Sequence, residues 1–458
     1  MGPYQPDFQQ PVSEQNSPQP QPGYPIFGQG GYGTYQPQPQ PQQQQPQYYY
    51  PAQGGGYYTM IPPPQLSQKP QRSAYRLTLG IISVIALALL LIGGLFSVLI
   101  GGIDVLLGSP LGSAAALVVL LVIAALGGGG VGLYFAIRAI ANKSSAAARF
   151  PPFYIFAALT AAVFITEFAI KLTSLPPSGM FSSFLIVLSG VLPALTILAF
   201  TINRLGNPTT WRRLWMSLLS GMFLATLIAI ILELTASAVI AIWFANGPGA
   251  LNSNILNSNS SVLYTLLIIS VVAPLVEEGF KPSGPLILIG RIRSPAEAFA
   301  LGLASGIGFN IFETIGYISS GQADWIQVAF ERIGAGLLHG VGAGMATLGW
   351  YYIFRGKGVR LRALKGIGAI IYAILQHALF NGSNLLNLVP GPIGNALNYP
   401  LYFLGMYETT QIFLFFAIYI LIALMLIKMT GALRLKPTEK TSENAQISTA
   451  SGVLTRNT

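Results

Sequence analysis

The segment VLYTLLIISVVAPLVEEGFKPSGPLILIG (residues 262–290) decides the fold class, because it is long, apolar and interrupted by three ionisable residues near its middle. About 20 apolar residues in a helix cross the ~30 Å hydrocarbon layer of a bilayer. Within lipid the backbone must satisfy its own hydrogen bonds, so such a segment forms a helix. We therefore predict a membrane-spanning helix that carries Glu277, Glu278 and Lys281 at membrane depth.

The rest of the chain repeats this pattern. Of its 458 residues, 52% are hydrophobic and 8% are charged, whereas a soluble domain is about 25% charged. An ordinary soluble domain is therefore excluded. We predict an all-α, polytopic membrane bundle of about ten transmembrane helices, five within residues 77–244 and five within 262–430, at 77–103, 111–140, 153–174, 182–203, 214–244, 262–290, 295–318, 327–354, 366–388 and 407–430.

The positions of the basic residues predict the orientation of the chain in the membrane. Of the 24 Lys and Arg residues, 21 lie on one predicted side of the membrane, either in the two tails or in and beside the loops of that side. The loops of the opposite side contain none. Because cytoplasmic loops are enriched in Lys and Arg, we expect a multi-pass cell-membrane protein with both termini in the cytoplasm. The net charge of +10 comes from small scattered clusters, which does not indicate nucleic-acid binding. The absence of Cys excludes disulfides, thiolate zinc sites and a Cys nucleophile.

Both ends of the chain differ from the apolar core. Residues 1–70 are rich in Pro, Gln, Gly and Tyr, as in PQPQPQQQQPQYYY (residues 37–50), and such a segment buries too little apolar surface to fold. We expect a disordered cytoplasmic tail, acting either as a plain appendage or as a Tyr/Pro-rich docking segment. Residues 431–458 are predicted to form a second disordered cytoplasmic tail.

Several charged residues inside the predicted spans are expected to be structural. Glu167 and Lys171 stand four residues apart, a spacing that lets them neutralise each other on one helix face. Arg332 follows Glu331 near the predicted external end of its span, and we expect it to be structural as well. Glu233, near the predicted external end of the fifth span, is expected to lie at the membrane interface.

A second set of polar residues predicts a functional layer. Lys281 offsets only part of the desolvation cost of two adjacent carboxylates, so packing alone does not explain the pair. Counting 1.5 Å per residue from the basic end of each helix puts six side chains about 18–27 Å into the membrane. Four helices therefore bring to one level Glu277, Glu278, Glu313, the only two histidines, His339 and His377, and Asn381.

The motifs in this layer, in their order along the chain, are similar to those of the PrsW family of intramembrane proteases, relatives of the CAAX-prenyl proteases and bacteriocin-immunity proteins. The likeness covers about residues 262–385. Four residues after the histidine the family often has Gly, whereas this chain has Ala343 four residues after His339, and Gly344 comes one position later. The matching motifs are Glu277-Glu278-x-x-Lys281, Phe309-x-x-x-Glu313, His339 with following glycines, and His377-x-x-x-Asn381.

The resemblance implies peptide hydrolysis by a water that a glutamate activates. We expect Glu277 or Glu278 to be the base, because burial shifts a carboxyl group toward the range where a general base works. His339 and His377 would hold the water or the tetrahedral intermediate, and Asn381 would donate to the oxyanion. The supporting residues would be Lys281, Phe309 and Glu313, with Glu313 orienting His339.

Three alternatives stay open at this point. No cofactor is expected, but Glu278, His339 and His377 leave open a zinc site, although no His-Glu-x-x-His motif occurs. The same polar layer would also suit an ion- or proton-coupled transporter or channel, or an inactive sensor. For a protease, the expected substrate is a single-pass or otherwise membrane-anchored protein, and the resemblance implies a regulatory one of the anti-sigma-factor type.

Overall fold

A computed structural model describes residues 127–141, 143–173, 179–246, 259–320, 325–355, 359–388, 391–403 and 406–435, with short stretches between 80 and 92. The predicted tail 1–70 and most of the predicted spans 77–103 and 111–140 lie outside these residues. By its internal contacts the chain divides into two units, Met1–Gln68 and Lys69–Thr458. All described residues belong to the second unit.

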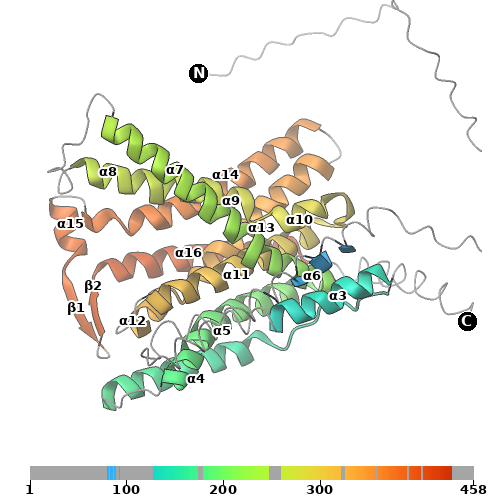
Figure 1. Ribbon diagram of the computed structural model, residues 1–458, viewed down its shortest axis with the longest axis horizontal. Coiled ribbons are helices and arrows are strands. Elements are labelled where there is room, and N and C mark those ends of the chain that lie inside the picture. The colour runs from blue at the N-terminus through green and yellow to red at the C-terminus, as the bar shows by residue number, and fades with distance from the viewer. Residues whose placement is uncertain are drawn as a thin grey trace, which may run out of the picture. The chain divides into compact units, whose positions relative to one another are not determined.

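Helices dominate the described residues (Figure 1). The first half contains α3 (Gly130–Ile140), α4 (Phe153–Thr173), α5 (Gly179–Leu205), α6 (Trp211–Leu219), the π-helix η2 (Ser220–Ala225) and α7 (Thr226–Asn246). The second half contains α8 (Asn259–Leu267), the π-helix η3 (Ile268–Val272), α9 (Ala273–Phe280), α10 (Ser283–Ile287), the 3-10 helix η4 (Ile289–Arg291), α11 (Pro295–Ser320), α12 (Trp325–Glu331), α13 (Ala335–Arg355), α14 (Val359–Ser383), the 3-10 helix η6 (Leu386–Leu388), α15 (Pro392–Leu397), β1 (Pro400–Phe403), β2 (Met406–Thr409) and α16 (Gln411–Ala432).

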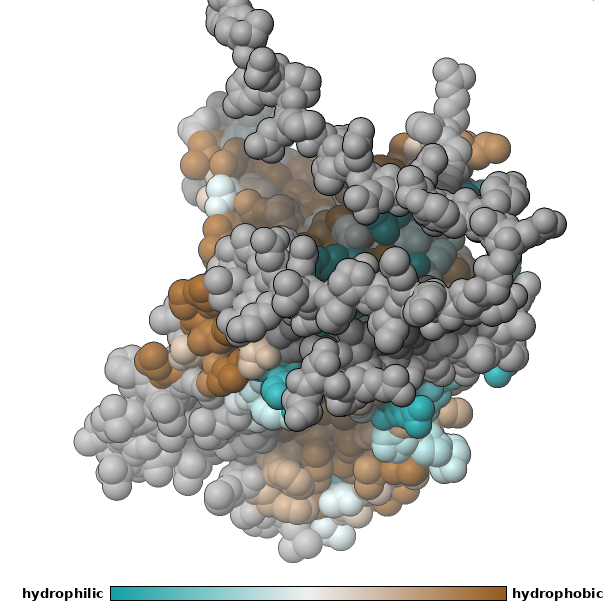
Figure 2. Space-filling model, turned by 90° about the vertical axis from the view of Figure 1, so that its right-hand side faces the viewer, coloured by the Kyte–Doolittle hydropathy of each residue, from teal (hydrophilic) through white to brown (hydrophobic). Residues whose placement is uncertain are grey.

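The predicted all-α membrane bundle is confirmed. Within the described residues, seven helical segments are long and apolar enough to cross a membrane. The glycine-rich α13 is not among them, although its side chains are largely buried. Much of the coloured surface in Figure 2 is hydrophobic, as expected of helices whose outer faces contact lipid.

Helix α11 lies at the centre of the bundle, with α13 on one side and α6 and η2 on another (Figure 1). Glycines make this close packing geometrically feasible. A Cβ atom on Gly306 would overlap the carbonyl oxygen of His339, and one on Gly308 would overlap that of Leu218. The backbones of α13 and α6 therefore approach α11 as closely as small residues at membrane helix interfaces allow.

Glu297 anchors the first turn of α11. Its backbone N–H donates to the Ser294 hydroxyl at 3.1 Å, which is half of a capping box. Its own carboxylate does not return to the Ser294 N–H; it accepts from the backbone N–H of Arg293 at 2.8 Å and from Arg213 Nη1 at 2.6 Å. The fully buried carboxylate thereby joins the starts of α11 and α6.

The predicted sixth span is broken twice, and both breaks lie beside the glutamate pair. The π-helix η3 precedes α9, which begins with Pro274 in its first turn. Helix α9 then ends at Phe280, and α10 begins after Pro282, because proline lacks the N–H that a continuous helix needs. This interruption leaves Glu277, Glu278 and Lys281 at the end of a short helix.

The β1–β2 hairpin is the one sheet in the described residues, and it lies outside the candidate spans. Leu401 pairs with Glu408 in its antiparallel register. The Glu408 side chain is buried, and its Oε1 has no hydrogen-bond partner among the described residues. Burial, with a smaller contribution from Glu331, raises the pKa of Glu408 to about 7.

We predict that Glu408 makes the stability of the folded chain pH-dependent. Because its pKa is higher when folded, its proton stabilises the fold fully below the unfolded value of 4.5, and this contribution is lost as the pH rises through about 7. Glu408→Gln should therefore flatten the fall in melting temperature between about pH 5 and pH 8. Thermal unfolding in detergent at several pH values measures this, and a slope equal to that of the wild type would contradict the assignment.

Candidate active site

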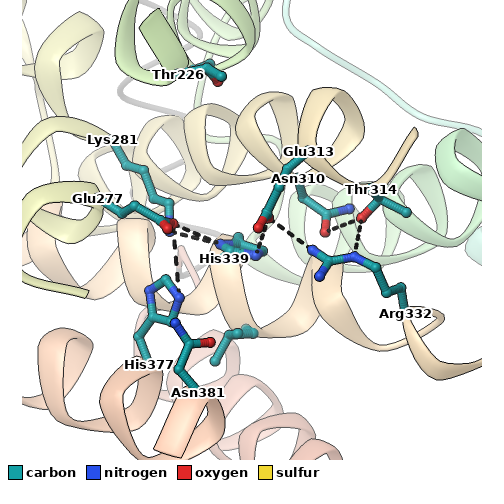
Figure 3. Close-up of polar contacts among 12 residues, drawn as sticks. Thr226, Glu277, Lys281, Asn310, Glu313, Thr314, Arg332, His339, His377 and Asn381 are labelled. Carbon is teal, nitrogen blue, oxygen red and sulfur yellow. Dashed lines mark hydrogen bonds and ion pairs between the residues drawn. The ribbon is translucent and has the colours of Figure 1, made fainter. Parts of the chain in front are cut away.

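The glutamate pair lies at the end of α9 and faces the interior of the bundle. The Glu278 side chain has no exposed surface, and that of Glu277 is 7% exposed. Both carboxylates contact the ammonium group of Lys281, at 2.9 Å from Glu277 Oε2 and 2.6 Å from Glu278 Oε1. The spacing that the sequence predicts for these three residues therefore brings them into one ion-pair cluster (Figure 3).

A third polar contact completes the surroundings of the Lys281 ammonium. His339 Nδ1 lies 2.7 Å from Lys281 Nζ, so the ammonium is hydrogen-bonded to Glu278 and His339 and forms an ion pair with Glu277. The ring of Phe309 lies 4.5 Å from the same nitrogen and adds a cation–π contact. Lys281 is thus fully buried among polar and aromatic partners.

His339 connects this cluster to a third carboxylate. It lies in the first turns of α13, and its Nε2 is 2.8 Å from Glu313 Oε2 on α11. An ionised carboxylate only accepts hydrogen bonds, so the Nε2–H donates to Glu313, and Nδ1 keeps the lone pair that faces Lys281. The structure therefore brings Glu313 to His339, the contact that the sequence predicts for an orienting residue.

His377 on α14 reaches the pair from the opposite side. Its Nδ1 donates to Glu278 Oε1 at 2.9 Å, and its Nε2 lies 3.8 Å from Glu277 Oε2. The corresponding distance from His339 Nδ1 to Glu277 Oε2 is 3.7 Å. Each imidazole thus has one nitrogen bound to a carboxylate and directs the other toward Glu277.

Asn381 does not contact the Glu/His cluster. It lies one helical turn after His377, as the sequence predicts, but its Nδ2 donates to the carbonyl oxygen of Ile269 at 2.9 Å. That carbonyl belongs to the π-helix η3, where the wider turn leaves backbone acceptors free. In this arrangement Asn381 holds α14 against the predicted sixth span.

Arg332 is the residue that sequence reasoning placed wrongly. Its Nη2 lies 2.8 Å from Glu313 Oε2, and its Nε donates to Thr314 Oγ1 at 3.2 Å (Figure 3). The side chain reaches Glu313 because the predicted eighth span is broken between α12 and α13, and Arg332 lies in that break. An arginine inside a span was the available signal, but Glu331, its neighbour in sequence, suggested the wrong partner.

Of the two other intramembrane glutamates, Glu233 departs from expectation, and the expectation for Glu167 stays a prediction. Glu233 follows Ala229 by one turn on the face of α7 that contacts Phe309, and it is close enough to interact electrostatically with Glu277. Glu233 is therefore nearer the site than the interfacial position expected for it. Glu167 is buried without a hydrogen-bond partner among the described residues, and its expected partner Lys171 has a side chain outside them.

The donor set fits a divalent metal ion. One ligand atom from each of Glu277, Glu278, His339 and His377 lies within 4.8 Å of the others, and all four residues are buried. Glu278 Oε2 is buried without a hydrogen-bond partner among the described residues, so it is free to bind a cation. Carboxylates that orient the histidines, as Glu313 and Glu278 do here, are typical of zinc sites.

These helices and this cluster define a polytopic membrane protein with a buried cluster of glutamates and histidines. Residues 209–422 match the model of the PrsW family, described as intramembrane metalloproteases. This match confirms the resemblance to that family of intramembrane proteases over this part of the chain, and it does not favour a transporter. The match extends beyond the expected 262–385 and includes α6, α7 and most of α16. No curated protein and no solved structure matches the chain.

Gly342 is predicted to be required for the position of Glu278. A Cβ atom at Gly342 would lie 2.6 Å from Glu278 Oε2, and the carboxylate could move away only by disturbing the bonds of its Oε1 to Lys281 and His377. Gly342→Ala should lower proteolysis about 100-fold through misplacement of the carboxylate, with a stability cost of about 1–3 kcal/mol. Gly368→Ala on α14 is the control, because nothing lies within 4 Å of its Cβ position. Equal activity of both variants would argue against this role.

Arg332 is predicted to stabilise the ionised form of Glu313. Removing one partner of a buried ion pair lowers the folding stability by about 3–5 kcal/mol. We expect the loss for Arg332→Gln to lie near the lower end of this range, because both side chains are about one-fifth exposed. Adding Glu313→Gln should restore part of the lost stability, because no uncompensated carboxylate remains. Denaturant unfolding of the two single variants and the double variant measures this coupling, and purely additive losses would exclude it.

Proposed function

We propose that this protein is an endopeptidase that hydrolyses peptide bonds of membrane-anchored proteins with a water activated by a glutamate. The observation that supports this most strongly is the convergence of both imidazoles on Glu277 Oε2, at 3.7 Å and 3.8 Å. A water next to that oxygen would have a base and two imidazole nitrogens within reach. General-base catalysis needs such proximity before it needs a matched pKa.

Glu277 is the better base and Glu278 the better positioning residue. Glu277 keeps 7% of its side chain exposed, whereas Glu278 is fully enclosed. A base must reach the water whose proton it takes. Glu278 Oε1 already accepts from Lys281 and His377, which suits a residue that orients the imidazole.

The remaining groups would act on the scissile peptide. His377 holds the water and then the hydroxyl of the tetrahedral intermediate through Nε2, and His339 joins it through Nδ1 once Lys281 leaves that atom. Glu313 keeps His339 in the tautomer with Nδ1 unprotonated. Asn381 donates to the oxyanion once its Nδ2 leaves the carbonyl of Ile269. Donors of this kind contribute about 100- to 1000-fold in rate.

A metal ion would be held by His339, His377 and Glu278, a His₂Glu set of the type found in catalytic zinc sites. When bound, such an ion lowers the pKa of a coordinated water and polarises a carbonyl. Glu277 remains beside the water in either case. The role of Glu277 as the base therefore does not depend on whether the site holds an ion.

The substrate class follows from the depth of the site. Glu277, Glu278, Glu313 and His377 lie on helical segments that are long and apolar enough to cross a membrane, so a substrate would have to present its peptide bond from within or beside the bilayer. A single-pass or otherwise anchored protein does this, and release of an anchored regulator is the consequence we favour. The charge distribution of the loops supports a multi-pass protein of the cell membrane with cytoplasmic termini.

The test is cleavage of a single-pass reporter by purified protein in vesicles. Glu277→Gln and His377→Ala should each reduce cleavage at least ~100-fold, in the range of general acid–base effects. The control is Glu331→Gln, because this carboxylate lies outside the cluster and accepts from Gln327 at 3.3 Å. Unchanged cleavage in the first two variants would remove the assigned site, whereas a loss of proton flux instead would favour a transporter.

A further inference from the structure

Lys281 occupies the lone pair that a metal ion needs on His339. An imidazole has one N–H and one lone pair when neutral. The Nε2–H of His339 is committed to Glu313 at 2.8 Å, and its Nδ1 lies 2.7 Å from Lys281 Nζ. A cation therefore cannot bind His339 through Nδ1 while the Lys281 ammonium donates to the same atom.

The ammonium also has the charge and position of a resident cation. It lies 2.6 Å from Glu278 and 2.9 Å from Glu277, two of the other three residues that could hold a metal. Without a cation, two buried carboxylates side by side would repel each other strongly. Lys281 removes that repulsion in the metal-free chain, and its own burial is offset by the same contacts.

We infer that Lys281 and a divalent metal ion are mutually exclusive occupants of this cluster, so that metal binding displaces the lysine from His339. This inference rests on the metal-binding form of the proposed function and assigns Lys281 a new role within it. The protein would keep a stable, charge-balanced site without metal, and its metal affinity would be lowered by the energy needed to move the ammonium. Loading would then be reversible in a site that is otherwise well built for zinc.

The mutual exclusion of Lys281 and the metal ion can be tested by measuring the zinc affinity of the full chain in detergent micelles, in competition with a chromophoric chelator. Lys281→Met removes the ammonium and keeps an unbranched side chain, and it should bind Zn²⁺ at least ~10-fold more tightly than the wild type, since no hydrogen bond from a charged donor to His339 Nδ1 would have to be broken first. An unchanged or weaker affinity would overturn the inference, because Lys281 would then be neutral or helpful to the metal.

A double-mutant cycle separates competition for the lone pair from simple charge repulsion. With His339→Gln as the background there is no Nδ1 lone pair to share, so Lys281→Met should change the zinc affinity less than about 2-fold, the limit expected for uncoupled sites. A gain of equal size in both backgrounds would mean that the lysine acts through space alone, and it would overturn the exchange.

A measurement on the wild type avoids dependence on a variant that fails to fold. An amine-selective acylating reagent should modify Lys281 faster when Zn²⁺ is bound, and the exposed Lys143 serves as the internal reference. Mass spectrometry reads both sites in one sample. Slower modification of Lys281 with zinc would contradict displacement. Neither the zinc affinity nor the acylation rate depends on proteolysis. A protein that cleaves no substrate would therefore refute the proposed function, and the displacement of Lys281 by zinc would still be tested by these two measurements.

Discussion

The structure of the second half of this protein depends on the neutralisation of charge inside a lipid-facing bundle. Lys281, Glu277 and Glu278 are buried together, and each would be costly alone. The cost falls because one ammonium has two carboxylates and an imidazole nitrogen within 2.9 Å. Helices α9, α11, α13 and α14 are arranged so that this neutralisation can occur.

The contacts extend beyond the ion pairs into one continuous chain of polar groups. From Arg332 they run through Glu313 to His339, then through Lys281 to the glutamate pair and His377. Positive and negative groups alternate along this path, with a neutral imidazole at two points. Because both imidazoles are bound to carboxylates, their tautomers and ring orientations are held before any substrate arrives.

Interruptions in the helices make this network geometrically feasible. Helix α9 ends after the glutamate pair, and Arg332 emerges between α12 and α13. Glycines contribute in a different way: Gly306 admits the backbone at His339, and Gly342 leaves space for Glu278 Oε2. A regular, uninterrupted bundle with larger residues at these positions would keep the same groups at similar depth but too far apart to share protons.

The sequence by itself determined the membrane class, the motif residues and their common depth, because hydropathy and helical rise depend only on local composition and spacing. It also identified Glu313 as a partner of His339, through the family resemblance. Only the tertiary structure decided that Arg332 pairs with Glu313, that Asn381 binds Ile269 and that Glu233 faces the site. Those contacts depend on how helices rotate and where they break, and residues far apart in the chain set both.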